Sequence, residues 1–377
     1  MLELPIKINF MKKLLFSLVA LLAVVLTTSA AEKGKNDLKF VDAQSLNICG
    51  HTMRTEKSPY YRFDCAPYNF KEEHIRRYSK YPVGMYVTFR TNSSQVWATW
   101  ENVKRRMGDN MTPIFQQGLD LYIKDGAKWR FCGVGRVSTD PEKNCRTKPI
   151  IENLSEGEKE FMLYLPSWCE ITRLEIGVDK DATIEAIPSP FRHKVVVFGS
   201  SITHGASASR PGMGYPARMS RALGIDFVNF GFSGNCKMQP EFIPFMTKVE
   251  ADAFICDAFA NPTAEEVAER VEPFIDAMVA AHPGKPIIML RPFHHESEYY
   301  DNVKHTKYVT KLRVAREKME MLTKKYKDVY YLDIPFATGG DCESTIDGSH
   351  PNDMGFDRII KSYQPKIVKI LKKYNIK

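Results

Sequence analysis

The hydrophobic pattern of this chain changes near residue 190, and this change constrains the fold more than any other feature. Before it, short segments alternate polar and apolar residues, whereas after it continuous apolar runs alternate with helical segments. Alternation is typical of antiparallel strands with one solvated face, and continuous apolar runs are typical of parallel strands covered on both faces. We therefore predict an all-β domain over residues 32–190 and an α/β domain over residues 191–377, a division that suits a chain of 377 residues.

The N-terminal half contains short strand-like segments separated by turn residues. The predicted strands cover residues 85–90, 96–100, 119–123, 128–131, 161–165 and 174–178. Asp125-Gly126 marks a hairpin between two of them. Many short strands with intervening turns indicate a β-sandwich or jelly roll.

The C-terminal half alternates strand-like and helical segments. The predicted strands cover residues 195–198, 226–230, 253–256, 286–290 and 329–332, and the predicted helices cover 213–223, 263–281, 309–325 and 354–374. This order predicts a parallel sheet flanked by helices, with Pro188-Ser189-Pro190 as the linker that precedes it.

Polar or glycine-containing turns follow several of the predicted parallel strands. Gly199-Ser200-Ser201 follows the first strand, residues 231–235 follow the second, residues 257–262 follow the third, and residues 347–350 come shortly after the fifth. Ligands of such sheets bind outside the carboxyl ends of the strands, so we expect these turns to converge on one edge.

These turns carry the parts of a nucleophilic serine site. A serine hydroxyl such as that of Ser201 becomes a useful nucleophile when a base takes its proton, and His350 can be that base near neutral pH. Asp347 can accept the other ring N–H and fix the tautomer. The backbone N–H groups of Ser201 and Gly234 and the amide of Asn261 can stabilise an oxyanion. Singly, each residue is better explained as a cap or turn residue, but their joint occurrence in order favours catalysis.

The same blocks resemble the SGNH (GDSL-type) hydrolase family. Gly199-Ser200-Ser201-Ile202 is similar to the Gly-Asp-Ser-(Leu/Ile) block, with Ser200 in place of its aspartate and Ser201 as the nucleophile. Gly234 matches the second block, only Asn261 matches the Gly-x-Asn-Asp block, and Asp347 and His350 match the Asp-x-x-His block fully. The resemblance implies an SGNH-like, flavodoxin-like α/β sheet and a metal-independent serine ester hydrolase with no cofactor.

A second resemblance lies in the N-terminal half. Gly118-Leu119-Asp120-Leu121-Tyr122 is similar to the Gly-x-Asp-Leu-Tyr motif of a β-rich domain that precedes some SGNH domains. The sequence assigns no role to this domain. Asp120 and Tyr122 alternate along a strand, which favours a structural role for both.

Further residues are candidates for substrate binding because of where they follow the strands. His204 comes after the nucleophile turn, and Arg291, His294 and His295 follow the fourth parallel strand. His294-His295-Glu296 lacks the His-Glu-x-x-His spacing of a zinc site, so we predict no metal. Ser233 is a rival nucleophile, but its turn lacks the final glycine of a Gly-x-Ser-x-Gly elbow.

The first residues have the pattern of a secretion signal. Lys12 and Lys13 precede an apolar run over residues 14–26 and the small residues Thr28-Ser29-Ala30. We predict a signal peptide over residues 1–31, a secreted or periplasmic protein and no membrane insertion after cleavage, with an uncleaved anchor as the alternative.

The chain has eight cysteines and a net charge of +8, which bear on disulfide formation and on nucleic-acid binding. An even number of cysteines in an exported protein permits disulfides, and Cys49–Cys65 and Cys132–Cys145 are plausible local pairs, although buried thiols are an alternative. The basic C-terminal helix is more typical of a solvated face, and no nucleic-acid-binding motif accompanies it.

The expected substrate is a small-molecule or polysaccharide ester. The family resemblance implies a short acyl group, for example acetyl, on a carbohydrate. One alternative is a catalytically impaired glycan-binding protein, because the block around Asn261 is degraded. Another is an esterase or lipase acting on a lipid or thioester. The oligomeric state does not follow from the sequence.

Overall fold

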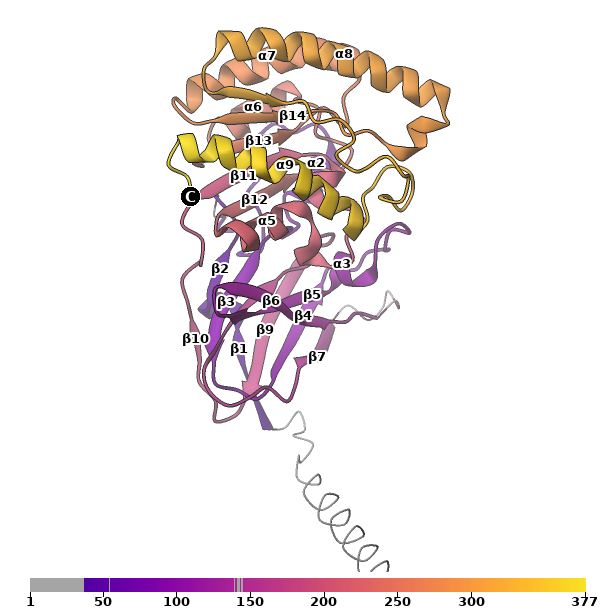
Figure 1. Ribbon diagram of the computed structural model, residues 1–377. Helices are drawn as coiled ribbons and strands as arrows, with labels where there is room; N and C mark the ends of the chain where they lie inside the picture. The colour runs from indigo at the N-terminus through magenta and orange to yellow at the C-terminus, as the bar shows by residue number, and fades with distance from the viewer. Residues whose placement is uncertain (1–36, 54, 139, 141–142, 144) are drawn as a thin grey trace, which may run out of the picture. The chain divides into compact units, whose positions relative to one another are not determined.

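The computed structural model describes residues 37–53, 55–138, 140, 143 and 145–377 (Figure 1). The chain divides into two units, Met1–Lys39 and Phe40–Lys377. Apart from the first residues of β1, the elements discussed below belong to the second unit. The predicted signal peptide over residues 1–31 lies outside the described residues.

Two antiparallel sheets form the N-terminal half. One has the order β1-β9-β4-β7, and the other has the order β10-β3-β8-β5-β6 with β2 paired to β3. The strands are β1 (Leu38–Asp42), β2 (Asn47–Cys49), β3 (Tyr86–Thr91), β4 (Val96–Asn102), β5 (Leu119–Asp125), β6 (Lys128–Gly135), β7 (Cys145–Ile151), β8 (Lys159–Tyr164), β9 (Ile171–Asp179) and β10 (Ile184–Ala186). Short helices α2 (Glu73–Tyr78) and α3 (Pro113–Gln117) accompany them.

Apolar side chains from both sheets meet in one core, which makes this half a β-sandwich as predicted. Phe89 of β3 and Phe161 of β8 stack with ring centroids 5.3 Å apart, and they share the core with Trp100 of β4. Trp100 is fully buried and donates its indole N–H to the Gln117 carbonyl at 2.9 Å. It is therefore a core residue.

The C-terminal half has one parallel sheet with the order β12-β11-β13-β14-β15. Its strands are β11 (Lys194–Gly199), β12 (Asp226–Gly231), β13 (Ala253–Asp257), β14 (Ile287–Leu290) and β15 (Val329–Leu332). The α-helices are α4 (Ser201–His204), α5 (Tyr215–Leu223), α6 (Ile243–Met246), α7 (Ala264–Ala281), α8 (Asn302–Lys325) and α9 (Asp353–Lys373). Figure 1 shows α7 and α8 side by side, and α5 contacts α9. The predicted helix-flanked parallel sheet is confirmed.

The sequence did not predict β1, β2, β7 and β10, and the last three of these are short or polar. β2 and β10 have three residues each, and β7 carries Arg146, Lys148 and Pro149 within seven residues. β7 lies at the end of its sheet, beside β4. Proline and charged residues are typical of edge strands, so their hydrophobic signal is weak.

Arg62, from the segment before α2, is buried against the parallel sheet. Its Nη1 donates to the carbonyls of Asn229 and Gly231, at 3.1 and 3.0 Å, and its Nε donates to the Tyr78 carbonyl at 3.1 Å. Burial lowers the pKa of Arg62 to about 9, so the side chain is charged at neutral pH. A buried cation needs polar partners, and here carbonyl oxygens of β12 supply them.

The predicted disulfides Cys49–Cys65 and Cys132–Cys145 do not form. All eight cysteines are described, and each is a free thiol. Cys49 packs with Tyr86 in a cluster separate from the large core that Cys65 contacts. Cys132 is partly buried against the sandwich core, whereas Cys145 is exposed at the start of β7. Proximity in sequence therefore did not bring either pair together.

Within the described ranges, we find no helix that has the length and apolar character needed to span a membrane. The sheet register has a direct consequence for the site. Gly199, at the end of β11, lies opposite both Gly231 of β12 and Asp257 of β13. The three turns that follow these strands therefore start at the same edge of the sheet, as the sequence predicted.

Candidate active site

Ser201 is the first residue of α4, and only Ser200 separates it from the end of β11. Ser200 caps this helix, because its Oγ accepts a hydrogen bond from the Ile202 N–H at 3.1 Å. The same Oγ donates to the buried Asp257 carboxylate at 2.6 Å. Ser200, which stands where the family has aspartate, thus ties the nucleophile turn to the end of β13. Ser201 itself is only 8% exposed.

Ser201, His350 and Asp347 form a continuous hydrogen-bonded chain. His350 Nε2 lies 3.0 Å from Ser201 Oγ, and His350 Nδ1 lies 2.7 Å from Asp347 Oδ2. The carboxylate at Nδ1 favours the tautomer with hydrogen on that nitrogen, which leaves Nε2 free to accept the serine proton. Ser201 belongs to α4, whereas Asp347 and His350 belong to the loop before α9. Ser201 and His350 are 149 positions apart in the sequence.

The Asp347 carboxylate accepts several further hydrogen bonds. Its Oδ1 accepts from the backbone N–H groups of Ser349 and His350, at 3.0 and 2.8 Å. Burial alone would raise the pKa of Asp347, but hydrogen bonds from Asn110 and His350 outweigh burial and hold that pKa well below its usual range. Asp347 therefore carries its negative charge throughout the neutral and mildly acidic range.

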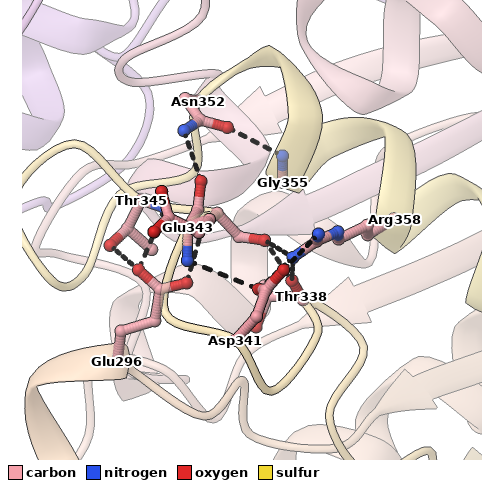
Figure 2. A network of polar contacts seen from close by, with 9 residues as sticks. Glu296, Thr338, Asp341, Glu343, Thr345, Asn352, Gly355 and Arg358 are labelled. Carbon is pink, nitrogen blue, oxygen red and sulfur yellow. Dashed lines mark hydrogen bonds and ion pairs between the residues drawn. The ribbon is translucent and has the colours of Figure 1, made fainter.

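Glu296 supports the loop that carries Asp347 and His350 (Figure 2). Its buried carboxylate accepts from the backbone N–H of Ser344 at 2.7 Å, and from the backbone N–H and hydroxyl of Thr345. The Thr345 hydroxyl in turn accepts from the Gly348 N–H at 3.1 Å. A charged acceptor at this position fixes backbone groups that would otherwise be buried without partners.

The same loop is attached to α9 from the other side. Arg358 donates to Asp341 at 2.7 Å and to the Ser344 hydroxyl at 2.6 Å (Figure 2). Asn352 caps α9 by accepting from the Gly355 N–H, and its Nδ2 donates to the Glu343 carbonyl, both at 2.9 Å. The loop is thus held between η5 (Glu296–Tyr299) and α9.

Gly234 and Asn261 lie in the two turns beside the nucleophile. Gly234 has a φ of 70°, which favours glycine, and it is exposed. Asn261 Oδ1 accepts from the Cys236 N–H at 3.2 Å, which links the third turn to the second. This bond occupies the oxygen end of the Asn261 amide, so its Nδ2 is the end that can donate to an oxyanion.

The predicted substrate residue His204 is in the interior. It is 1% exposed, its Nε2 lies 2.8 Å from the Ser167 carbonyl, and its ring centroid lies 4.3 Å from that of Trp168. Burial lowers the pKa of His204 well below its usual value. These surroundings give His204 a packing role, and we no longer assign it to substrate contact.

The predicted substrate residues Arg291 and His294, which follow β14, are held by partners of their own. Arg291 donates to Asp333 at 2.8 Å and to the Tyr308 hydroxyl at 3.0 Å. His294 lies between the rings of Tyr299 and Tyr308, with Nε2 3.7 Å from the Glu298 carboxylate. These partners hold both side chains within the β14–α8 connection. Among the residues described, no group of three or more His, Cys, Asp or Glu side chains could hold a metal ion, so His294 and His295 are not part of such a group.

His295 is the predicted substrate residue that borders the hydrogen-bonded chain. Its Nδ1 lies 2.8 Å from the hydroxyl of Ser349, the residue before His350. Burial and the charges of Lys311 and His350 lower the pKa of His295 to about 4. His295 is therefore neutral at physiological pH and can take part in hydrogen bonds next to the base.

Sequence reasoning missed Asn110. This residue lies in the connection between β4 and α3, in the β-rich half, and its Nδ2 donates to Asp347 Oδ2 at 3.0 Å. It is 237 positions away from Asp347. A single asparagine in a polar loop gives no local signal, so only the three-dimensional arrangement identifies it.

Comparison with known families agrees with this geometry. Residues 192–368 match the GDSL-like lipase/acylhydrolase family, and residues 38–184 match the GxDLY family, the N-terminus of SGNH-hydrolase-type esterases. A comparison with curated proteins gave no match.

The structure is similar to several solved structures. A GDSL-like lipase from Bacteroides ovatus is 39% identical, with a TM-score of 0.85, and the match covers 89% of this chain and 98% of that chain. A salicylyl-acyltransferase from a tetracycline biosynthetic pathway is 19% identical, with a TM-score of 0.66 and coverage of 90% and 96%. A family two carbohydrate esterase from Cellvibrio japonicus is 12% identical, with a TM-score of 0.58 and coverage of 89% and 98%. The last two likenesses show the fold alone.

The fold and the site together define an SGNH-type hydrolase with an N-terminal GxDLY domain. This chain belongs to the GDSL-like lipase/acylhydrolase family.

We predict that Glu296→Gln weakens both the fold and the reaction. A glutamine presents an NH₂ group to backbone donors at Ser344 or Thr345, so one buried N–H loses its acceptor. We expect a loss of about 1–3 kcal/mol in the free energy of unfolding, measured by urea denaturation, and a lower kcat for p-nitrophenyl acetate. The control Glu317→Gln changes an exposed ion pair on α8 and should shift stability by less than about 0.5 kcal/mol. Equal behaviour of the two variants would contradict the supporting role of Glu296.

Proposed function

We propose that this protein is a serine esterase that removes a short acyl group, acetyl in the first instance, from a carbohydrate. The observation that carries the proposal is the hydrogen-bonded chain from Ser201 through His350 to Asp347. The catalytic serine, the absence of a metal requirement and the substrate class are all parts of this proposal.

The reaction follows from the positions of the protons. As Ser201 Oγ attacks the carbonyl carbon, its proton moves to His350 Nε2, and Asp347 stabilises the resulting imidazolium. The tetrahedral intermediate collapses when His350 gives that proton to the leaving alcohol, which leaves an acyl group on Ser201. Water then attacks the acyl-enzyme while His350 again takes a proton, and acid is released as Ser201 regains its hydrogen.

The developing oxyanion needs donors that are fixed before the reaction. We assign this role to the backbone N–H groups of Ser201 and Gly234 and to Asn261 Nδ2. Support comes from the aligned ends of β11, β12 and β13 and from the bond that orients the Asn261 amide. Such donors stabilise the transition state more than the ester itself, because the oxygen becomes charged only as the bond forms.

The choice of substrate rests on family and fold. Carbohydrate esterases of family two and an acetyl xylan esterase from Butyrivibrio proteoclasticus share the fold at low identity, 12% for the latter. Export, proposed from residues 12–31, would bring the protein to extracellular or periplasmic polymers. The alternative of an impaired glycan-binding protein is less favoured because Ser201 and His350 lie within proton-sharing distance. A lipid or thioester substrate is the remaining alternative.

We predict that Ser201→Ala abolishes ester hydrolysis. Removal of a catalytic serine lowers kcat by about three orders of magnitude or more. The substrates should be p-nitrophenyl acetate, p-nitrophenyl esters of longer acids and a panel of acetylated sugars, with the released acid identified by mass. Ser233→Ala, at the rival serine, should keep the activity. Equal rates for the wild type and Ser201→Ala would remove the catalytic proposal, whereas cleavage of only long-chain esters would favour the lipid alternative.

We predict that kcat/KM for p-nitrophenyl acetate, measured from about pH 5 to about pH 8, rises with pH, because a protonated imidazole cannot accept the serine proton. Asp347 does not add a step in this range, since its pKa is held well below the usual value. His295, with a pKa lowered to about 4, is already neutral there. A flat profile over this range would count against His350 as the base.

We predict that Asn261→Ala lowers kcat by about 10²–10³-fold with a smaller change in KM, as expected for a lost oxyanion donor. The measurement is a Michaelis profile for p-nitrophenyl acetate at a pH on the plateau. Asn302→Ala, an exposed asparagine at the start of α8, is the matched control and should leave kcat unchanged. An unchanged kcat in Asn261→Ala would exclude this side chain from the oxyanion hole.

A further inference from the structure

Asp347 Oδ2 accepts hydrogen bonds from two different parts of the chain. One donor is His350 Nδ1 at 2.7 Å, and the other is Asn110 Nδ2 at 3.0 Å. Asn110 Nδ2 also lies 3.4 Å from His350 Nδ1. The amide therefore sits against both members of the pair, on the side away from Ser201 Oγ, which His350 contacts through Nε2.

Asn110 is held in place by contacts on both sides of its loop. The backbone carbonyl of Asn110 accepts from the Ser207 hydroxyl at 2.8 Å. The side-chain amide of the buried Gln116 accepts a hydrogen bond from the Gly108 N–H through Oε1, at 2.7 Å. Its Nε2 donates to the Met111 carbonyl at 2.9 Å. A side chain on such a fixed loop can orient a partner with little loss of conformational entropy.

The segment that contacts Asn110 is itself fixed by the GxDLY motif. The fully buried Asp120 accepts from Arg210 Nε at 3.0 Å and from the Gly212 N–H at 2.9 Å. The Ser209 carbonyl accepts from the Thr112 hydroxyl at 2.7 Å. The segment 207–212 of the α/β half is thus attached to the β-rich half at Ser209, Arg210 and Gly212, directly after the Asn110 contact at Ser207.

We propose that Asn110 is a positioning residue for the Asp347–His350 pair, so that the β-rich half completes a catalytic site whose nucleophile and base lie in the α/β half. This inference rests on the proposed function of Ser201 and His350. It gives the N-terminal domain a role in the chemical step, beyond any role in binding substrate.

The physical basis is the orientation and charge of the carboxylate. The backbone donors at Oδ1 and the Asn110 amide at Oδ2 leave Asp347 one preferred orientation, with Oδ2 directed at His350 Nδ1. Without the amide, the carboxylate can rotate and the imidazole loses its fixed position relative to Ser201. Loss of one hydrogen bond to a charged group corresponds to about a tenfold or larger change in rate when it acts in the transition state.

The Asn110→Asp variant tests the electrostatic part of this proposal by introducing an aspartate. It is nearly isosteric with asparagine but places a second carboxylate beside Asp347 and the His350 ring. A nearby negative charge favours the protonated imidazole, so the inactive form of the base persists to higher pH. The neighbouring His295 interacts electrostatically with Lys311, His294, His350 and Asp347. Because its pKa is lowered to about 4, His295 stays neutral over the range of the profile.

The experiment compares the full-length wild type with Asn110→Ala, Asn110→Asp and the control Asp109→Ala, the exposed neighbour in the same loop. Each pH–rate profile is measured with p-nitrophenyl acetate. We expect Asn110→Ala to lower kcat about tenfold with KM within about twofold, and Asn110→Asp to move the acid limb up by roughly one pH unit. Asp109→Ala should match the wild type.

Two outcomes separate this inference from the proposed function. If Ser201→Ala retains the activity, the proposed function fails. If Ser201→Ala is inactive but Asn110→Ala keeps kcat and Asn110→Asp keeps the position of the acid limb, only the role of Asn110 is overturned. Thermal unfolding of each variant is measured in parallel. If Asn110→Ala does not fold, the position of the acid limb in Asn110→Asp decides, because a residue that merely packs the loop would alter stability without moving that limb.

Discussion

The Asp347 carboxylate is the anion on which the candidate site depends. It must remain charged and hold one orientation, because the direction of the His350 ring follows from it. Backbone N–H groups of its own loop, the ring of His350 and the amide of Asn110 all donate to it. The loop can make these bonds because Glu296 supports its start. A reactive serine thus requires acceptors and donors that lie far from it in sequence.

The parts that could be predicted from the sequence are those with a local signal. Ser201, Asp347 and His350 stand in short blocks at the ends of strands, and the apolar runs of β11 to β15 are long enough to be recognised. Their convergence followed from one rule, since the turns of a parallel sheet that follow its strands lie at one edge. The assignment of catalytic roles to these residues stays a proposal, although the distances agree with it.

Other features depend on contacts that no local pattern encodes. The sequence shows Glu296 only as the end of a His-His-Glu run, because the backbone groups that it binds lie 48 and 49 positions away. His204 is only three residues after Ser201, but its ring packs against Trp168 in the interior. Proximity in sequence suggests two cysteine pairs, whereas packing places Cys49 and Cys65 in separate clusters and leaves Cys145 exposed. Position along the chain is a weak guide to the direction of a side chain.

The buried guanidinium of Arg62 bears on how the two halves can be separated. It donates hydrogen bonds to carbonyl oxygens at the end of β12, immediately before the turn that carries Gly234. A C-terminal half produced alone would leave those oxygens without the cation and uncover the Phe232 ring on which it lies. Recombining the α/β half with an unrelated accessory domain would therefore require a replacement for that cation, because a fusion at residue 190 would remove the Arg62 contacts.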